Sequence, residues 1–121
     1  MAKENIVNTK SFLFAIKIVN TYKHLTENKK EYVLSKQLLR SRTSIGANIR
    51  EADNAESKLD FIHKMSIAQK ESDETLYWLE LLNGTNYLTA KEFDSISFDA
   101  VELLKLIRSI IITTKKNIHR L

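Results

Sequence analysis

Apolar side chains recur every three or four residues along most of this chain, which is the spacing of one face of an α-helix. Short polar segments divide the pattern into four stretches, so it predicts helices at residues 8–26, 29–53, 57–83 and 89–118. A helix of about 20 residues is about 30 Å long, and short connections force neighbouring helices to run antiparallel. The pattern therefore predicts an all-α, antiparallel up-and-down four-helix bundle that occupies residues 1–121 as one domain.

Each predicted helix has a stripe of apolar positions that we expect to face the core. The first stripe is Phe12, Ile16, Val19 and Leu25, and the second is Leu34, Leu38, Ile45, Ile49 and Ala52. The third is Phe61, Met65, Ala68, Leu76, Leu79 and Leu82, and the fourth is Ile96, Ala100, Leu104, Ile107, Ile111, Ile118 and Leu121. Three pairs spaced by three residues resemble the caps that open helices, namely Asn28 with Glu31, Ser57 with Asp60, and Thr89 with Glu92.

Composition favours the same fold class. The chain has no proline and only two glycines, so the residues that punctuate sheets and long loops are nearly missing. Its N-terminus lacks the pattern of a secretory signal, and Lys105 and Arg108 interrupt the longest apolar cluster well before the roughly 20 residues of a membrane span. It has no cysteine, which excludes disulfides and thiolate metal sites. We expect a cytoplasmic protein with no membrane partner.

Charge is distributed unevenly along the sequence. Residues 1–30 carry six Lys/Arg against two acids, whereas residues 55–88 carry three against six, so antiparallel or diagonal packing of the basic first helix and the acidic third would be electrostatically favourable. No acid follows Glu102, and the formal net charge is +4, which makes RNA or DNA a candidate partner. The candidate nucleic-acid-binding residues are Lys10, Lys17, Arg42, Arg50, Lys105, Arg108, Lys115, Lys116 and Arg120.

A polar stripe lies beside the core stripe of the second predicted helix, and its members are Gln37, Ser41, Ser44, Asn48 and Glu51. Polar groups in that position must be solvated or paired. The stripe is therefore a solvated face, a ligand site, or a subunit interface or ring lumen. The residues alone leave these three interpretations open, and we expect Trp78 to be an aromatic anchor of the core or interface.

Enzyme chemistry finds little support in the sequence. Glu71 and Glu74 share a helix face, as in magnesium-binding pyrophosphatases, but the fourth helix offers no second acidic pair in a matching arrangement. No glutamate has a histidine three residues on, as di-iron bundles require, and His24, His63 and His119 lie on separate helices. We expect no catalytic residue, no metal, no cofactor and no small-molecule substrate.

Two stretches resemble a known family. Residues 37–52 read QLLRSRTSIGANIREA, and residues 66–82 read SIAQKESDETLYWLELL. In combination, and over nearly the whole chain, they resemble the bacterial four-helix-bundle family that includes proteins encoded in intervening sequences of large-subunit ribosomal RNA genes. Accessory proteins of diversity-generating retroelements are relatives. The chain departs from the family pattern at Arg42 and Arg50, and both departures add positive charge.

The resemblance implies a four-helix subunit that assembles into a closed ring, most often of five copies, without an established enzymatic activity. It therefore favours a subunit interface or ring lumen as the role of the polar stripe and of Trp78. It also implies nucleic-acid binding, from the retroelement relatives and the gene context. The function expected from the sequence is thus a non-catalytic, ring-forming, nucleic-acid-binding accessory protein. The alternative is a protein-binding or purely structural oligomeric adaptor without affinity for nucleic acid.

Overall fold

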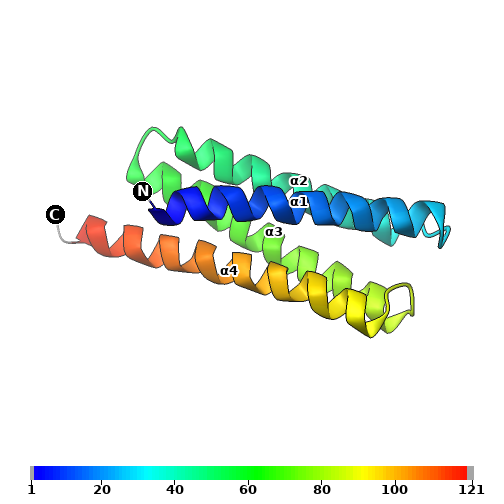
Figure 1. Cartoon of the computed structure of the whole chain (residues 1–121). Helices are drawn as coiled ribbons and strands as arrows, with labels where there is room; N and C mark the ends of the chain where they lie inside the picture. The colour runs from blue at the N-terminus through cyan, green and yellow to red at the C-terminus, as the bar shows by residue number, and fades with distance from the viewer. Residues whose placement is uncertain (1, 120–121) are drawn as a thin grey trace.

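This computed structural model describes residues 2–119, and among them the side chains of residues 6–41 and 44–118. The described residues contain four helices, which are joined by turns, and no strand. The helices are α1 (Ala2–Glu27), α2 (Leu34–Asp53), α3 (Lys58–Gly84) and α4 (Ala90–His119). Successive helices run in opposite directions, so both termini lie at one end of the molecule (Figure 1). This arrangement confirms the predicted fold class of an all-α helical bundle.

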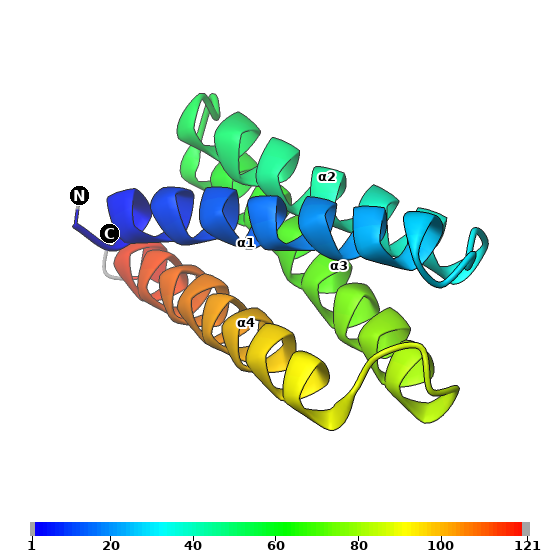
Figure 2. The same ribbon diagram turned by 45° about the vertical axis from the view of Figure 1, so that its right-hand side comes forward.

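Each helix packs against two neighbours: α1 against α2 and α4, and α3 against α2 and α4. In the described part of the chain, the backbones of the diagonal helices α1 and α3 do not approach each other. The basic first helix and the acidic third are therefore diagonal, which is one of the two arrangements that their charges favour. The α1–α4 pair has the loosest packing, because these two helices diverge away from the termini (Figures 1 and 2).

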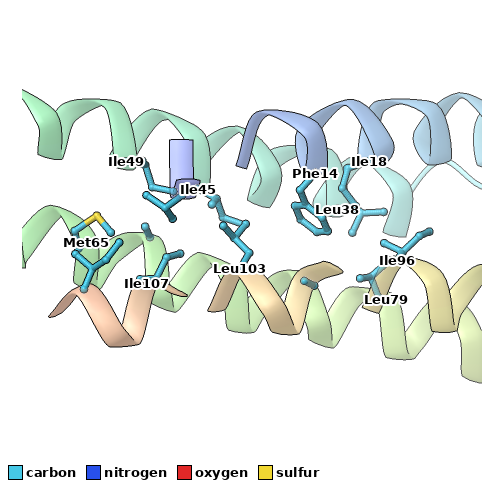
Figure 3. Packing of buried hydrophobic residues seen from close by; sticks show 14 of the residues in the cluster. Phe14, Ile18, Leu38, Ile45, Ile49, Met65, Leu79, Ile96, Leu103 and Ile107 are labelled. Atoms are coloured by element: carbon cyan, nitrogen blue, oxygen red, sulfur yellow. The ribbon is translucent and has the colours of Figure 1, made fainter. Parts of the chain in front are cut away.

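The core is a continuous cluster of aliphatic side chains along the bundle axis, and Figure 3 shows several of its members between the helices. The predicted stripes of α2, α3 and α4 are confirmed for all the described residues except Ile118, since each is buried or packs against the buried cluster. Leu121 lies outside the described residues. On α2 and α4 helical spacing identified these stripes because polar residues occupy the opposite sides of the helices, whereas α3 also carries exposed apolar residues such as Leu59 and Tyr77.

The predicted stripe of α1 is largely wrong. Phe12 and Ile16 are 58% and 45% exposed, whereas Leu25 is fully buried as expected. The residues of α1 that reach the aliphatic core are Val7, Phe14, Ile18 and Leu25. This helix carries apolar side chains on nearly all of its sides, so spacing alone does not distinguish the inner face from the outer one.

Several hydroxyl groups are buried with the aliphatic side chains. Ser72 and Thr75 of α3 donate to the carbonyls of Ala68 and Glu71, and Thr21 of α1 donates to the carbonyl of Lys17, at 2.8–2.9 Å. Each hydroxyl thus bonds one turn back on its own helix, which satisfies it without a partner from another helix. The hydroxyls of Thr21, Ser72 and Thr75 are therefore buried without being left unpaired.

The start of α2 differs from the expectation. The helix begins at Leu34 and not at residue 29, and Asn28 bonds His24 at the end of α1 instead of capping α2. Glu31 caps α2 from outside the helix: its carboxylate accepts the amides of Val33, Leu34 and Ser35 at 2.9, 2.6 and 2.9 Å. The start of an α-helix leaves four backbone amides without a partner inside the helix, and Glu31 accepts three of them at the start of α2. One buried side chain therefore caps this end of the helix.

The caps expected for α3 and α4 are confirmed. Ser57 Oγ accepts the amide of Asp60 at 3.0 Å. Thr89 and Glu92 form a reciprocal capping box, in which the Thr89 amide donates to Glu92 at 2.8 Å and the Glu92 amide donates to Thr89 Oγ1 at 3.1 Å. Both pairs satisfy amides that the helix itself cannot satisfy.

The capping box predicts a dependence of stability on pH. The hydrogen bond from the Thr89 amide, helped by the nearby charges of His24 and Lys29, holds the pKa of Glu92 below its ordinary value of 4.5. The contribution of ionised Glu92 to the stability of the fold is therefore complete above about pH 4.5 and is lost as the pH falls through the lowered pKa. We expect Glu92→Gln to flatten the fall in melting temperature between about pH 5 and pH 3. Asp94→Asn is the control, and an unchanged slope in Glu92→Gln would contradict the prediction.

No helix within the described residues combines the length and the apolarity needed to cross a membrane.

Candidate nucleic-acid interface

Two of the candidate basic residues are bound to acids within the bundle. Lys10 and Lys17 lie two turns apart on the side of α1 that faces α4, and their Nζ atoms lie 2.8 Å from Glu102 Oε1 and 2.6 Å from Asp99 Oδ2. Lys17 also donates to Ser95 Oγ at 2.9 Å. These contacts neutralise both lysines and tie α1 to α4 along their loosely packed seam, so neither is a free cation for a partner.

The seam also carries two surface hollows of about 410 and 390 Å³, one on each side of Lys17. At the wider end, His24 Nε2 lies 3.7 Å from Glu92 Oε2 over a floor that includes Leu88 and Ile96. Most of the charged side chains that line the hollows are paired with a side chain of opposite charge across the seam. They therefore hold two helices together and do not present a surplus of either charge to a ligand.

The C-terminal half of α4 is different, because its cations lack acidic partners. Lys105, Lys115 and Lys116 are exposed, and no acid of the described chain lies within ion-pair distance of them. Arg108 makes one long contact, 3.8 Å from its Nη2 to Asp73 Oδ1, and both side chains are half-exposed. Exposed pairs of this kind contribute only about 0–1 kcal/mol, so Arg108 remains available to a stronger anion.

The remaining candidates are divided between the surface and the undescribed part. Arg50 is exposed and lines a hollow between α1 and α2 with Asn8, Gly46 and Asp53. Asn8 donates to Asp53 at 3.0 Å, which leaves the Arg50 guanidinium without an acidic partner at ion-pair distance in the described chain. The side chains of Arg42 and Arg120 lie outside the described residues.

The polar stripe of α2 faces α3. Glu51, its last member, lines a hollow with Asp60 and Lys64 at the α2–α3 end, and the other members precede it by steps of three and four residues. Ser41 is buried and donates to the carbonyl of Gln37 at 3.1 Å, while Asn48 is half-buried and donates to the carbonyl of Ser44 at 2.7 Å. Part of the stripe is thus used within one subunit, and a role for it between subunits stays a prediction.

Trp78 lies on α3 and packs in part against the core cluster. Its ring meets that of Tyr77 edge to face, with 5.2 Å between the centroids, and Tyr77 itself is more than half exposed. The expectation of a core or interface anchor therefore matches its position on the side of the core, while its use by a second subunit stays a prediction.

Glu71 is the acid whose surroundings oppose ionisation. Partial burial raises the pKa of Glu71, the neighbouring Glu74 raises it further by its charge and by a hydrogen bond, and Arg40 and Lys70 act in the opposite direction. The described residues contain no group of three or more His, Cys, Asp or Glu side chains that could hold a metal ion. The pair is thus a local repulsion on α3, next to Arg40 of α2.

This repulsion gives a prediction for stability. At neutral pH the fold has to keep Glu71 ionised, so Glu71→Gln is expected to raise the free energy of unfolding by about 0.5 kcal/mol. Because the pKa of Glu71 is raised in the folded state, Glu71 of the wild type becomes protonated as the pH falls through the raised pKa, and the repulsion is removed. The difference in stability between the variant and the wild type therefore disappears below about pH 4.5. Melting curves at pH 7 and pH 4 test it, with Glu80→Gln as control. A variant less stable than the wild type at pH 7 would contradict it.

Two surface features escaped the sequence analysis. The outer side of α1 exposes four large apolar side chains, at Ile6, Phe12, Leu13 and Ile16. The turn between α1 and α2 exposes Lys29, Lys30, Tyr32 and Val33. The apolar crowding of α1 is a signal for the first feature, and the adjacent lysines are a signal for the second, although a polar turn gives the same pattern.

Comparison with known proteins agrees with the helical architecture and with the motifs of α2 and α3. The family model of the 23S rRNA-intervening sequence proteins matches residues 3–109, which is most of the chain. The chain belongs to this family. The match ends before the last lysines of α4, so the family resemblance rests on the bundle and not on the basic C-terminal segment.

One member of this fold group is a crystal structure at 1.70 Å resolution from Bacteroides thetaiotaomicron VPI-5482, described as a protein with unknown function from the S23 ribosomal protein family. It is 57% identical, and the alignment covers 90% of this chain and 97% of that one, with a TM-score of 0.89. No curated protein matches this chain. The 23S rRNA-intervening sequence family therefore fixes the kinship and the fold, and the function has to be argued from the surface.

Proposed function

We propose that this chain is a non-catalytic bundle subunit that assembles into a ring, with five copies as the expected number, and binds RNA or DNA through basic surfaces. The observation that carries the proposal is the C-terminal half of α4, where Lys105, Lys115 and Lys116 are exposed without acidic partners. No acid follows Glu102 in the sequence, so nothing on this segment offsets their charge.

The family name supports an RNA-related role, because it connects these proteins with an intervening sequence of 23S rRNA. Binding of a phosphate backbone needs cations, not a pocket or a cofactor, and the released counterions supply much of the affinity. Exposed lysines on a helix meet this need. Lys10 and Lys17 do not, because each is already paired with an acid of α4.

Assembly would make a weak surface effective. A formal charge of +4 for each chain gives about +20 for five copies, and repetition of one patch around a ring raises avidity without any new contact. The expected binding is therefore electrostatic, directed by shape, nearly independent of sequence, and steeply dependent on salt.

Charge reversal tests the proposal. We expect Lys115→Glu with Lys116→Glu to lower affinity for a mixed-sequence RNA at least about tenfold at about 50 mM salt, measured by filter binding. The control is Lys58→Glu with Lys70→Glu on α3, which changes the net charge by the same amount at exposed positions. Absence of binding by the wild type would refute the nucleic-acid role, and equal losses in both variants would reduce it to net charge alone.

The outer side of α1 favours the alternative function, a protein-binding or purely structural adaptor. Phe12 and Leu13 are 58% and 59% exposed next to Ile6 and Ile16, and such contiguous apolar surface marks protein interfaces. If the protein assembles but retains no nucleic acid in the filter assay, this alternative replaces the nucleic-acid role.

A further inference from the structure

The turn between α1 and α2 presents a basic and aromatic surface at the end of the bundle opposite the termini (Figure 1). We call it the basic turn and define it as Lys29, Lys30, Tyr32, Val33 and Lys36, all of which are exposed. Tyr32 and Val33 are 58% and 73% exposed, which is unusual for large side chains that could have packed against the adjacent helices. None of these residues is among the candidate nucleic-acid-binding residues that the sequence indicates.

The geometry of the basic turn is fixed from inside. Glu31, only 6% exposed, accepts the amides of Val33, Leu34 and Ser35, while its own amide donates to the carbonyl of Leu25 at 2.9 Å. These bonds remove the acid from the surface and hold the neighbouring Tyr32 outward. The surface that remains is positive and pre-organised, with Glu27 as the exposed acid on this stretch of chain.

Local stability does not account for two of the lysines. Lys30 has φ = 55°, in the left-handed region where a side chain costs about 1–2 kcal/mol and where glycine or asparagine is the usual residue. Lys36 lies in the first turn of α2, which contains no acid, although the helix dipole favours acids there and disfavours cations. Both positions carry a lysine against the preference of the backbone, which is a pattern of functional sites.

We propose that the basic turn binds single-stranded nucleic acid, with an unpaired base stacked on the Tyr32 ring and backbone phosphates held by Lys30 and Lys36. The inference rests on the proposed nucleic-acid role and assigns to it a second contact, at the other end of the bundle from Lys115 and Lys116. Exposed aromatic rings beside cations are the common means of binding single strands without sequence preference. Lys29 is a weaker contributor because its charge already acts on Glu92.

Charge makes a second copy of this chain a poor occupant of the basic turn. A second copy that docked by the same turn would bring like charges together, and Lys30 and Lys36 have no acid at ion-pair distance in the described chain to offset them. A duplex would satisfy the lysines but would keep its bases stacked inside, out of reach of Tyr32. The combination of ring and cations therefore fits a single strand best.

The test compares a labelled 20-nucleotide RNA of mixed sequence with the blunt duplex of the same sequence, using the full chain and fluorescence anisotropy. Tyr32→Ala is expected to weaken single-strand binding about tenfold, and Tyr32→Phe to preserve it, because the ring remains. Lys30→Gly with Lys36→Gln should lower the salt slope, −d log K/d log [salt], by about 1.4 for the two lost phosphate contacts. Lys30→Gly also relieves the left-handed backbone, so this variant loses affinity while its fold is retained or strengthened.

The outcomes separate the two proposals. If the wild type binds neither RNA, the proposed function and this inference both fail. A second outcome is that the wild type binds and that Lys115→Glu with Lys116→Glu weakens binding, while Tyr32→Ala and Lys30→Gly with Lys36→Gln bind as the wild type does. In that case the proposed function stands and the basic turn is excluded as a binding site. If Tyr32→Ala instead changes the mass by light scattering, the turn is an interface between copies and the inference is wrong.

Discussion

Replacement of Glu31 by alanine is expected to lower the free energy of unfolding by about 3 kcal/mol, which is the largest effect we predict for a residue outside the apolar core. The side chain is buried, and its carboxylate accepts three amides at the start of α2. Alanine leaves these donors without a partner in a place that water reaches poorly. A loss of this size corresponds to a decrease in melting temperature of about 10 °C for a chain of this length.

The design of the experiment isolates the carboxylate from the rest of the turn. Glu27→Ala removes an exposed acid four residues earlier and should change stability by less than about 0.5 kcal/mol. Glu31→Gln keeps the size and one acceptor oxygen, so its loss should be intermediate. Chemical unfolding at a fixed protein concentration is the measurement. A loss below about 1 kcal/mol in Glu31→Ala would mean that water or a neighbouring group satisfies the three amides.

Sequence patterns predicted the core faces of α2 and α4 because these helices have distinct polar sides, and on α3 the heptad-like spacing of the apolar residues was sufficient without one. On α1 the choice between Phe12 with Ile16 and Phe14 with Ile18 depends on which side meets the other helices. Both sets have helical spacing and similar apolarity, so only the packing distinguishes them. The same ambiguity hid the exposed side of α1, which is visible only when the inner set has been identified.

The candidate site shows a similar limit. The sequence does not distinguish Lys17 from Lys105 as candidate binding residues. In the structure, Lys17 Nζ lies 2.6 Å from Asp99 Oδ2, whereas Lys105 has no acid at ion-pair distance in the described chain. The difference depends on the register between α1 and α4, which no local pattern encodes. Capping shows a similar limit: the pair Thr89 and Glu92 has the spacing of a capping box and was predicted, whereas the way Glu31 caps the amides that follow it depends on how the turn folds.

Replacement of Leu13 and Ile16 by glutamine together is expected to dissociate the assembled protein into single subunits. These residues are 59% and 45% exposed at the edge of the hollow between α1 and α4, which both of them line, and glutamine keeps helix propensity while it removes apolar surface. The broad apolar face predicted for α4 is used largely within the subunit, because Leu103, Leu104 and Ile107 are buried there. In light scattering at about 10 µM, a five-membered ring of 14.0 kDa chains has a mass of about 70 kDa, and the variant should approach the mass of one chain.

The matched control is Leu59→Gln with Phe98→Gln, which removes two large side chains that are 71% and 69% exposed on α3 and α4. Neither this control nor the α1 variant alters any charge, so a change in nucleic-acid affinity cannot come from the electrostatics of one subunit. If assembly multiplies a weak patch, the α1 variant loses affinity for RNA together with its mass, and the control loses neither. A wild type that is monomeric at this concentration, or a control that dissociates while the α1 variant does not, would overturn the assignment of the interface to α1.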